Sequence, residues 1–490
     1  VKKGALIMTE TLKDEWLKNP GKNIMAGIVV ALALIPEAIA FSIIAGVDPM
    51  VGLYAAFIIA TVTAIVGGRP AMISGATAAV ALVVTPLVKD YGVQYLFAAT
   101  ILMGLIQLLL GILKVGRLLK FIPRSVMIGF VNALGIMIFL SQIEHIFGIS
   151  IDTYIYVTIT LLIVFILPKF FTIVPAPLIA IVVLTILYLT MGANIHTVGD
   201  LGTIKQALPH FTIPHVPFNL ETLKIIFPYS LSMAIVGLVE SLLTAKIVDD
   251  YTNTYSNKNR EARGQGIANI ITALFGGMGG CAMIGQSGIN VRSGANSRLS
   301  TLTAGLFLIF MIMVLGHIVI QIPMPVLAGI MVMVSVGTID WGSFKYIKHA
   351  PKTDVFVMIL TVIIVLFTHN LALGVVIGIV FSALFFATKI SNIKVETRKE
   401  NNQYFIVFKG PIFFVSIDTM MTQIDFNVQR ETIQLDFSDA HIWDDSAVDA
   451  IETIVRKLED KHNEVYVKNL NKDSRKVVSE LSQLKENQLI

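Results

Sequence analysis

The sequence has little of what enzymes and disulfide-bonded secreted domains depend on. Only 14% of its 490 residues are charged, and Cys281 is its one cysteine, which excludes an internal disulfide framework. Its histidines have no metal-ligand spacing, and it contains no phosphate-binding glycine loop, nucleophile elbow or zinc motif. We therefore expect no enzymatic centre, no metal, no cofactor and no ATP-driven pumping by this chain on its own.

Apolar residues dominate instead. They make up 55% of the chain, the mean hydropathy is +0.77, and runs near the ~20 residues that cross a bilayer recur along it. The sequence predicts a polytopic α-helical membrane protein. Residues 1–23 are mixed and charged, so we expect no cleavable signal peptide. The net charge of +4 bears on membrane topology rather than on nucleic acid, which we do not expect as a partner.

The apolar spans number about fourteen, and the longest connector, 192–226, divides them into two similar halves. We expect them near residues 24–44, 52–67, 76–88, 94–113, 124–143, 154–168, 172–191, 227–247, 264–280, 286–297, 301–320, 324–338, 353–369 and 371–388. The predicted domains are an N-terminal segment 1–23, a transport domain 24–388 with repeats at about 24–191 and 227–388, a linker 389–401 and a soluble domain 402–490.

The basic residues predict the orientation. With the N-terminus inside, the inner connectors hold Arg69, Lys114, Arg117, Lys120, Arg124, Lys169, Lys258, Arg260, Arg263, Lys345, Lys348 and Lys352, and the outer ones little beyond Lys89, Lys205 and Lys224. This bias follows the positive-inside rule. An even number of spans then leaves both termini in the cytoplasm, and we expect a multi-pass protein of the cell membrane, as in a bacterial inner membrane.

The tail is predicted to be a small α/β domain. Its apolar stretches favour strands at 404–408, 411–415, 432–437 and 464–468, and helices near 417–426, 447–461 and 473–486.

Two interrupted segments, 70–82 and 283–294, occupy corresponding places in the two halves. Each is a short helix candidate with polar or small residues at its start. Paired broken helices are typical of the binding site of an inverted-repeat transporter, although small residues also serve close helix packing. The candidate donors to a ligand are Ser74, Gly75, Ala76 and Thr77 in the first segment and Gly285, Gln286 and Ser287 in the second.

Neither segment begins with Lys or Arg. Because each helix start supplies only about half a positive charge, the pair favours a small anion bound without a salt bridge.

Glu240 lies in the middle of an otherwise apolar span. An ionisable side chain at that depth is costly and by default functional, the alternative being a packed glutamate hydrogen-bonded to a neighbouring helix. An ionised carboxylate would repel a nearby anion, so anion binding should accompany protonation of Glu240 or a neutralising cation. We expect proton–anion symport. Sodium is the alternative, because Glu240 and Thr244, one turn apart, offer oxygen ligands.

Two further runs carry a family resemblance. The stretch from Pro36 to Tyr54 resembles the signature of the SulP family of anion transporters, and the stretch from Asn259 to Asn269 resembles a second common run. The tail resembles the STAS domain of that family. The resemblance implies two inverted repeats of about seven spans, with half-helices at the third and tenth spans, and a homodimer.

The resemblance also places three side chains. It implies that Glu37 and Phe41 line the substrate cavity and that the acidic position of Glu240 faces the substrate and takes part in cation coupling. The alternative for the first two is a glutamate beside the kink at Pro36 and a core phenylalanine.

Ser446 matches the serine that is phosphorylated in bacterial anti-sigma-factor antagonists of the STAS superfamily. Asp444, Asp445 and Ser446 also form a helix N-terminal cap signature, which we favour, and the two aspartates would oppose an added phosphate.

These features together predict a secondary transporter of sulfate, bicarbonate or small dicarboxylates that works by alternating access. Two alternatives remain: an uncoupled anion channel, and a membrane sensor that signals to a cytoplasmic protein through its STAS tail.

Overall fold

The computed structural model describes residues 15–116, 122–171, 174–200, 207–400 and 403–482. Several predictions lie outside these residues in whole or in part: residues 1–14 of the N-terminal segment 1–23, the start of the span 172–191, the meeting point of the linker 389–401 and the domain 402–490, the connector positions Arg117, Lys120 and Lys205, and the end of the closing helix beyond residue 482. The chain divides into two compact units, Val1–Ile379 and Val380–Ile490, which are described separately.

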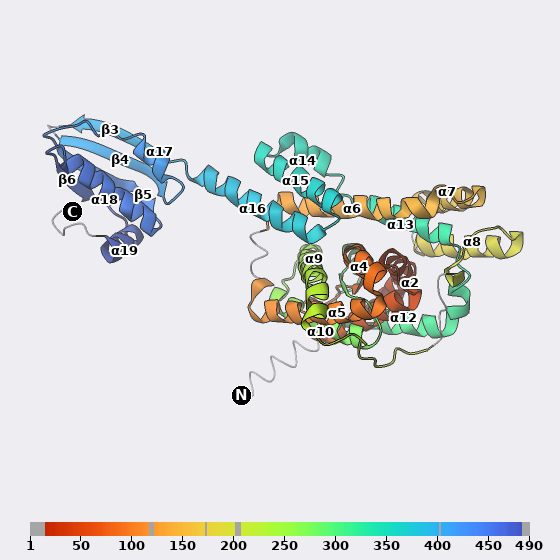
Figure 1. Ribbon diagram of the computed structural model, residues 1–490. Helices are drawn as coiled ribbons and strands as arrows, with labels where there is room; N and C mark the ends of the chain where they lie inside the picture. Colours follow the sequence, from red (N-terminus) through yellow and green to blue (C-terminus); the bar gives the residue numbers. More distant parts are fainter. Residues whose placement is uncertain (1–14, 117–121, 172–173, 201–206, 401–402, 483–490) are drawn as a thin grey trace. The chain divides into compact units, whose positions relative to one another are not determined.

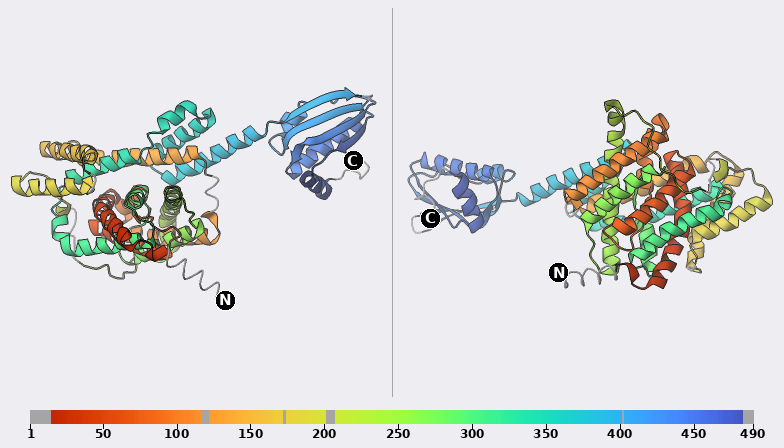
Figure 2. Two further views of the ribbon diagram at one scale, coloured as in Figure 1. Left: turned by 180° about the vertical axis from the view of Figure 1, so that it is seen from behind. Right: turned by 90° about the horizontal axis from the view of Figure 1, so that it is seen from below.

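The helices of the first unit form two groups, which lie against each other in Figure 1 and are seen from behind in Figure 2. The first group contains α2 (Pro20–Ala45), α3 (Pro49–Val66), α4 (Ala78–Tyr91), α5 (Val93–Ile112), α9 (Leu220–Thr252), α10 (Lys258–Leu274), α11 (Ile284–Arg292) and α12 (Arg298–Val319). The second group contains α6 (Arg124–Ile146), α7 (Ile151–Ile166), α8 (Ala176–Met191), α13 (Met324–Thr338), α14 (Ser343–His349), α15 (Lys352–Thr368) and the beginning of α16 (Leu371–Ile390).

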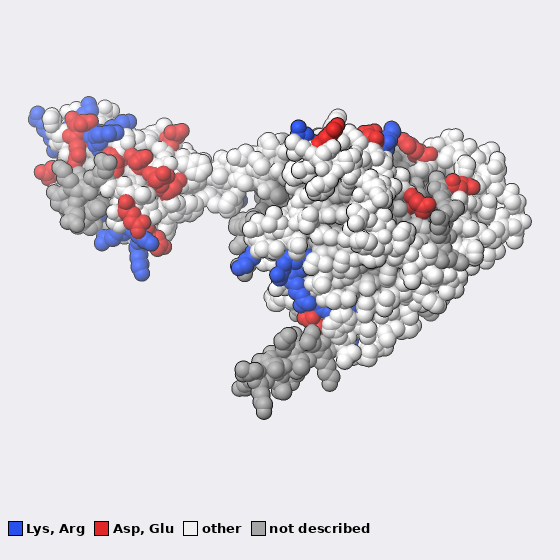
Figure 3. Space-filling model, turned by 60° about the horizontal axis from the view of Figure 1, so that its bottom comes forward, with Lys and Arg blue, Asp and Glu red and all other residues white. Residues whose placement is uncertain are grey.

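A helix lies at each predicted span, which confirms a polytopic helical membrane protein. Within the described part of the chain, nine helices are long and apolar enough to cross a membrane, so the count of fourteen spans stays a prediction. Figure 3 shows a broad face of the first unit with few charged side chains. Such a surface suits lipid contact.

Two predicted spans have boundaries that were wrong by six or seven residues. The span expected at 227–247 is α9, which begins at Leu220 because the Asn219 side chain accepts a hydrogen bond from the Thr222 amide. The span expected at 264–280 is α10, which begins at Lys258 after the Asn257 cap and ends at Leu274. Hydropathy missed both starts because their first turns are polar.

Each half of the first unit begins with two helices, a short strand and a third helix. The strands are β1 (Ser74–Ala76), between α3 and α4, and β2 (Gly280–Ala282), between α10 and α11. They pair antiparallel, with Gly75 opposite Cys281. This pairing, which the sequence did not predict, holds the two broken segments together and gives the halves the matching order expected of repeats.

Side chains of α9 and α10 satisfy backbone groups of β2, which an apolar interior requires in the absence of water. Asn269 accepts from the Gly280 amide at 2.9 Å and donates to the Gly280 carbonyl at 3.1 Å. Ser241 Oγ accepts from the Ala282 amide at 3.0 Å. The broken segments are therefore fixed by α9 and α10.

The second unit contains a sheet in the order β3-β4-β5-β6, in which β3 is antiparallel to β4 and the other pairs are parallel. Its elements are β3 (Lys394–Glu400), β4 (Gln403–Ile412), α17 (Ile417–Met421), β5 (Thr432–Ile442), α18 (Asp445–Glu459), β6 (Glu464–Lys468) and α19 (Lys472–Leu481). The rings of Phe408 and Phe437 stack in its core with centroids 4.6 Å apart.

Two strand predictions in this unit need correction. The strands expected at 404–408 and 411–415 are one strand, β4, whose register shifts between Val407 and Lys409 just before Gly410 at φ +113°. The predicted linker 389–401 was also wrong, because β3 lies within it and pairs with β4. β3 was missed because its residues are mostly charged and exposed and show no apolar alternation.

Gly280 provides a test of the β1–β2 pairing. A Cβ at Gly280 would lie 1.9 Å from the Gly75 carbonyl oxygen, a backbone atom. We expect Gly280→Ala to lower the free energy of unfolding by about 1–3 kcal/mol through overpacking, measured as thermal unfolding of the purified protein. Gly288→Ala in α11, where a Cβ meets no atom within 4 Å, is the matched control and should leave the unfolding temperature unchanged or higher. Equal stability of the two variants would refute the close approach.

Candidate functional site

A cavity of about 360 Å³ lies between the two helix groups of the first unit. The first group contributes residues from α2, α9 and the starts of α4 and α11: Glu37, Phe41, Thr77, Ala78, Glu240, Met283, Ile284, Gly285, Gln286 and Ile289. The second group contributes residues from α6 and α13: Phe130, Val131, Leu134, Ile138, Met333, Val334, Gly337 and Thr338. The cavity therefore has one wall that ends in two helix starts and one apolar wall.

The two helix starts are uncapped. Thr77 and Met283 occupy the N-cap positions of α4 and α11, and neither side chain accepts a hydrogen bond from its own helix. Asp48, Ser150, Asn219 and Asn257 cap the starts of α3, α7, α9 and α10, whereas α5, α6 and α12 also lack a side-chain cap. What sets α4 and α11 apart is that their starts line the cavity. The first amides of a helix have no intrahelical partner, and they carry the positive end of its dipole. The cavity wall thus offers two sets of free amide donors.

None of the described residues that line the cavity has a cationic side chain. Of the described residues that line it, Glu37 and Glu240 are the ionisable ones, and Lys, Arg and His are missing. The Gln286 amide donates to Glu37 Oε1 at 2.5 Å, and the Cys281 thiol donates to Glu240 Oε2 at 3.0 Å. Gln286 is 3% exposed, and its Oε1 has no hydrogen-bond partner in the described part of the structure. A buried acceptor on a cavity wall needs a donor, such as a water molecule or the hydroxyl of a protonated ligand.

The cavity brings together part of the residue set expected from the sequence. Glu37, Phe41, Thr77, Glu240, Gly285 and Gln286 line it. They come from four elements of both halves, and Phe41 is 3% exposed. Their roles toward a substrate stay predictions.

The other expected residues hold the framework and are not among the described residues that line the cavity. Ser74, Gly75 and Ala76 form β1. Ser287 Oγ accepts from the Ile73 amide at 2.9 Å, which ties α11 to the segment before β1. Thr244 Oγ1 donates to the Glu240 carbonyl oxygen at 2.7 Å, a bond within α9.

The apolar wall from α6 and α13 was not predicted as part of the site. The sequence analysis named no residue there, because an apolar stretch that lines a cavity has the same pattern as one that faces lipid. Thr338 is the one hydroxyl side chain among the described residues of that wall. The two helices contact each other through small residues, where Ser335 Oγ donates to the Gly135 carbonyl at 2.9 Å.

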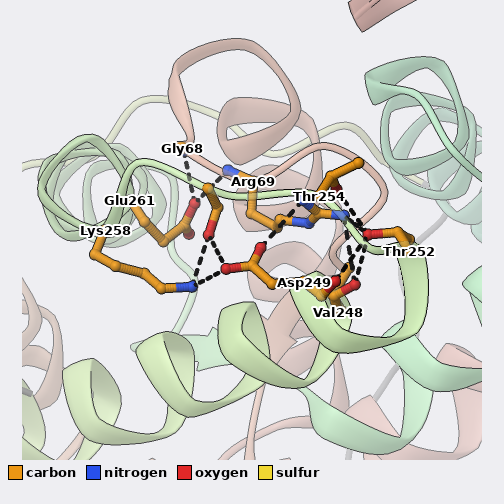
Figure 4. A network of polar contacts seen from close by, with 9 residues as sticks. Gly68, Arg69, Val248, Asp249, Thr252, Thr254, Lys258 and Glu261 are labelled. Atoms are coloured by element: carbon orange, nitrogen blue, oxygen red, sulfur yellow. Dashed lines mark hydrogen bonds and ion pairs between the residues drawn. The ribbon is translucent and has the colours of Figure 1, made fainter. Parts of the chain in front are cut away.

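A polar network connects the end of α3 with the end of α9 and the start of α10 (Figure 4). Arg69 Nη1 lies 3.1 Å from Asp249 Oδ1, and Lys258 Nζ lies 2.6 Å from Asp249 Oδ2. Arg69 also donates to Thr252 Oγ1 at 2.5 Å and to Thr254 Oγ1 at 2.7 Å. Asp249 therefore balances two cations, one of them buried.

Glu261 extends this network to the broken segment. Its Oε2 accepts from the amides of Gly68 and Arg69 at 2.7 and 3.1 Å (Figure 4). Its Oε1 accepts from Gln265 Nε2, which also donates to Ser74 Oγ, both at 2.8 Å. The network fixes the chain that leads from α3 into β1.

In the second unit, the segment around Ser446 forms the predicted helix cap. Asp444 is the N-cap residue of α18, and its Oδ1 accepts from the Ala447 amide at 2.9 Å. Its Oδ2 accepts from the Phe414 amide at 2.9 Å. The cap is confirmed, and phosphorylation of Ser446 stays a prediction.

Comparison with known families agrees with both units. The profile of the sulfate permease family matches residues 21–165 and 151–361, and that of the STAS domain matches residues 392–489. The putative sulfate transporter YbaR of Bacillus subtilis is 54% identical over 473 residues, which cover 96% of this chain and 99% of that protein.

Two solved structures have a similar fold. The transmembrane domain of a cyanobacterial bicarbonate transporter, BicA, has a TM-score of 0.64 at 27% identity over 74% of this chain and 97% of that one. The murine Slc26a9 anion transporter has a TM-score of 0.82 at 17% identity over 96% of this chain and 89% of that one. The latter likeness supports the fold alone.

Asp249 provides a test of the network. Asp249→Asn leaves the buried Arg69 without its counter-charge, and we expect a loss of about 3–5 kcal/mol in the free energy of unfolding. Thermal unfolding of the purified protein measures it. Asp250→Asn, at the exposed neighbouring position, is the matched control and should change stability by less than about 0.5 kcal/mol. If the two variants unfold at the same temperature, the network does not stabilise this end of the fold.

Proposed function

The chain belongs to the sulfate permease family, and from this premise we propose that it is a secondary transporter that carries a small oxyanion together with a proton. The substrate class is sulfate, bicarbonate or a small dicarboxylate. Glu240 is the coupling carboxylate, and the cavity between the two helix groups is the substrate site. The protein is a transporter and not an enzyme.

One observation carries this proposal: the cavity combines two uncapped helix starts with two carboxylates and has no cationic side chain among its described residues. Amide donors suit the oxygens of a small oxyanion. The two dipole ends supply about one positive charge together. That charge does not outweigh a bound anion plus ionised glutamates. Neutralisation of a carboxylate must therefore accompany the anion.

Glu240 is better suited than Glu37 to be the coupling group. Glu37 receives a hydrogen bond from the Gln286 amide, whereas Glu240 receives one from a thiol, which is a weak donor. The weaker donor stabilises the ionised form less, so Glu240 is the carboxylate that takes the proton. A proton that binds with the anion and leaves with it couples the two fluxes.

The walls of the cavity support alternating access as the mechanism. One wall belongs to α2, α4, α9 and α11 and the other to α6 and α13, so the site lies where the two helix groups meet. Movement of the first group against the second would expose the cavity to one side of the membrane at a time. The uncapped helix starts would move with the first group as one body.

The proposal also includes the oligomeric state, the membrane and the orientation of the chain. We propose a homodimer in the cell membrane with both termini in the cytoplasm, where the STAS domain is available to a protein partner. The basic residues Arg69 and Lys258, expected on the inner side, meet in one network, which is consistent with that orientation.

Glu240→Gln tests the proposed coupling. In proteoliposomes with an inward proton gradient of about one pH unit, the unaltered protein should accumulate its anion up to about tenfold for each coupled proton. The variant should exchange anions across the membrane without proton-driven accumulation. Glu221→Gln, an exposed position at the start of the same helix, is the control and should accumulate normally. Uptake of radiolabelled sulfate, bicarbonate and fumarate measures the effect and identifies the anion.

Two outcomes would overturn the proposal. Accumulation driven by a sodium gradient and not by a proton gradient would establish sodium coupling, for which Glu240 and Thr244 are the candidate ligands. Non-saturating anion current that is insensitive to both gradients would establish a channel.

A further inference from the structure

Three buried side chains form a hydrogen-bonded chain from the centre of α9 to the start of α4. Cys281 Sγ lies 3.0 Å from Glu240 Oε2 and 3.1 Å from Thr77 Oγ1. Cys281 belongs to β2, and Thr77 directly follows β1, so the pairing of the two strands brings these groups together. Cys281 is fully buried, and Thr77 is 2% exposed. The cavity is lined by both ends of this chain, Glu240 and Thr77.

The hydroxyl of Thr77 bonds to Cys281 rather than to the start of its own helix. A threonine at an N-cap position ordinarily accepts a hydrogen bond from its own helix, but Thr77 does not cap α4. Its recorded hydrogen bond goes to the Cys281 thiol, and either atom of that pair is able to donate. A hydroxyl and a thiol each have one proton to donate. If the Cys281 thiol donates to Glu240, it must therefore accept from Thr77, and if it accepts from Glu240, it is able to donate to Thr77.

We propose that Cys281 is a positioning residue that transmits the protonation state of Glu240 to the hydroxyl of Thr77, and thereby switches the cavity between rejecting and binding an anion. This inference rests on the proposed function, in which Glu240 takes the coupled proton.

In the ionised state, Glu240 accepts a hydrogen bond from the Cys281 thiol, for which the two heavy atoms are close enough. The sulfur then accepts from the Thr77 hydroxyl. With its proton committed to the sulfur, Thr77 offers the cavity only oxygen lone pairs. An anion meets a carboxylate and an acceptor oxygen, and both repel it.

In the protonated state, the Glu240 hydroxyl donates to the sulfur. The S–H then turns to Thr77 Oγ1, and the Thr77 hydroxyl is free to donate to an anion in the cavity. It joins the uncapped amides of α4 beside it. The sulfur keeps one hydrogen in both states, so no proton crosses the thiol, and the proton on Glu240 comes from solution.

The other titratable groups near Glu240 do not provide this connection. Among the described residues of the elements packed against α9, α5 has Tyr95 near its start, and α4 has Lys89, Asp90 and Tyr91 in its last turn. Arg292 is the last residue of α11, and the charges of α10 lie in its first two turns: Lys258, Arg260, Glu261 and Arg263. Glu37 lines the same cavity from α2 but is bonded to Gln286. Cys281 is thus the group in hydrogen-bond contact with both Glu240 and Thr77.

Two substitutions at Cys281 test the relay through the pH profile of the KM for anion uptake in proteoliposomes. In the unaltered protein, the KM should rise about tenfold for each pH unit above the titration of Glu240. Cys281→Ala breaks the chain, so its KM should be raised at acid pH and should rise less steeply with pH, because only the charge of Glu240 still opposes the anion. Cys281→Ser keeps one donor proton and two acceptor lone pairs and should restore the profile. A contact that is only structural would not distinguish serine from alanine in this way.

Thr77→Val cuts the chain at its other end and remains informative if Cys281→Ala does not fold. It should reproduce the flattened pH profile, and the double variant should be no flatter than either single variant, because both remove the same connection. Wild-type pH dependence in Cys281→Ala or in Thr77→Val would refute the relay while leaving proton coupling intact. Absence of proton-driven uptake in the unaltered protein would instead refute the proposed function.

Discussion

The antiparallel contact between β1 and β2 is the interaction on which the rest of the first unit depends. Two interruptions of the helical backbone lie in an apolar interior, where each free amide and carbonyl group needs a partner. The strands pair with each other, and Asn269, Ser241 and Ser287 satisfy several of the remaining groups. The paired strands hold the starts of α4 and α11 in place, so these starts do not depend on side-chain caps of their own.

The charge balance of the cavity follows from that arrangement. Two helix starts supply about one positive charge, and Glu37 and Glu240 contribute up to two negative charges. A Lys or Arg side chain on the described wall would attract an anion whether or not a proton was bound. The described wall instead has two carboxylates, and the hydrogen-bond donor is an amide for Glu37 and a thiol for Glu240. We infer that the affinity for an anion is set by a proton, and that β2, which carries Cys281, takes part in the coupling as well as in the framework.

The sequence predicted the parts of this structure that depend on local pattern. Hydropathy located the helices, and the polar starts of the two broken segments pointed to Thr77, Gly285 and Gln286, which line the cavity. Their role as donors to a ligand stays a prediction. The sequence could not predict that Gly75 would lie opposite Cys281, because strand pairing between residues so far apart is decided by tertiary structure. The sequence also could not distinguish Ser74 and Ser287, whose hydroxyls hydrogen-bond within the framework, from Thr77, which lines the cavity. All three are hydroxyl residues in a broken segment. The apolar wall from α6 and α13 has no chemical signature at all.

The number of protons taken up when the anion binds tests the central claim most directly. Titration calorimetry of the purified protein, in two buffers of different ionisation enthalpy, measures it with whichever of sulfate, bicarbonate and fumarate binds. At a pH where Glu240 is ionised in the free protein, we predict net proton uptake with the anion, lost in Glu240→Gln. Binding heats that are identical in the two buffers, with full anion affinity, would mean that the cavity accepts its anion without a proton and would contradict the account.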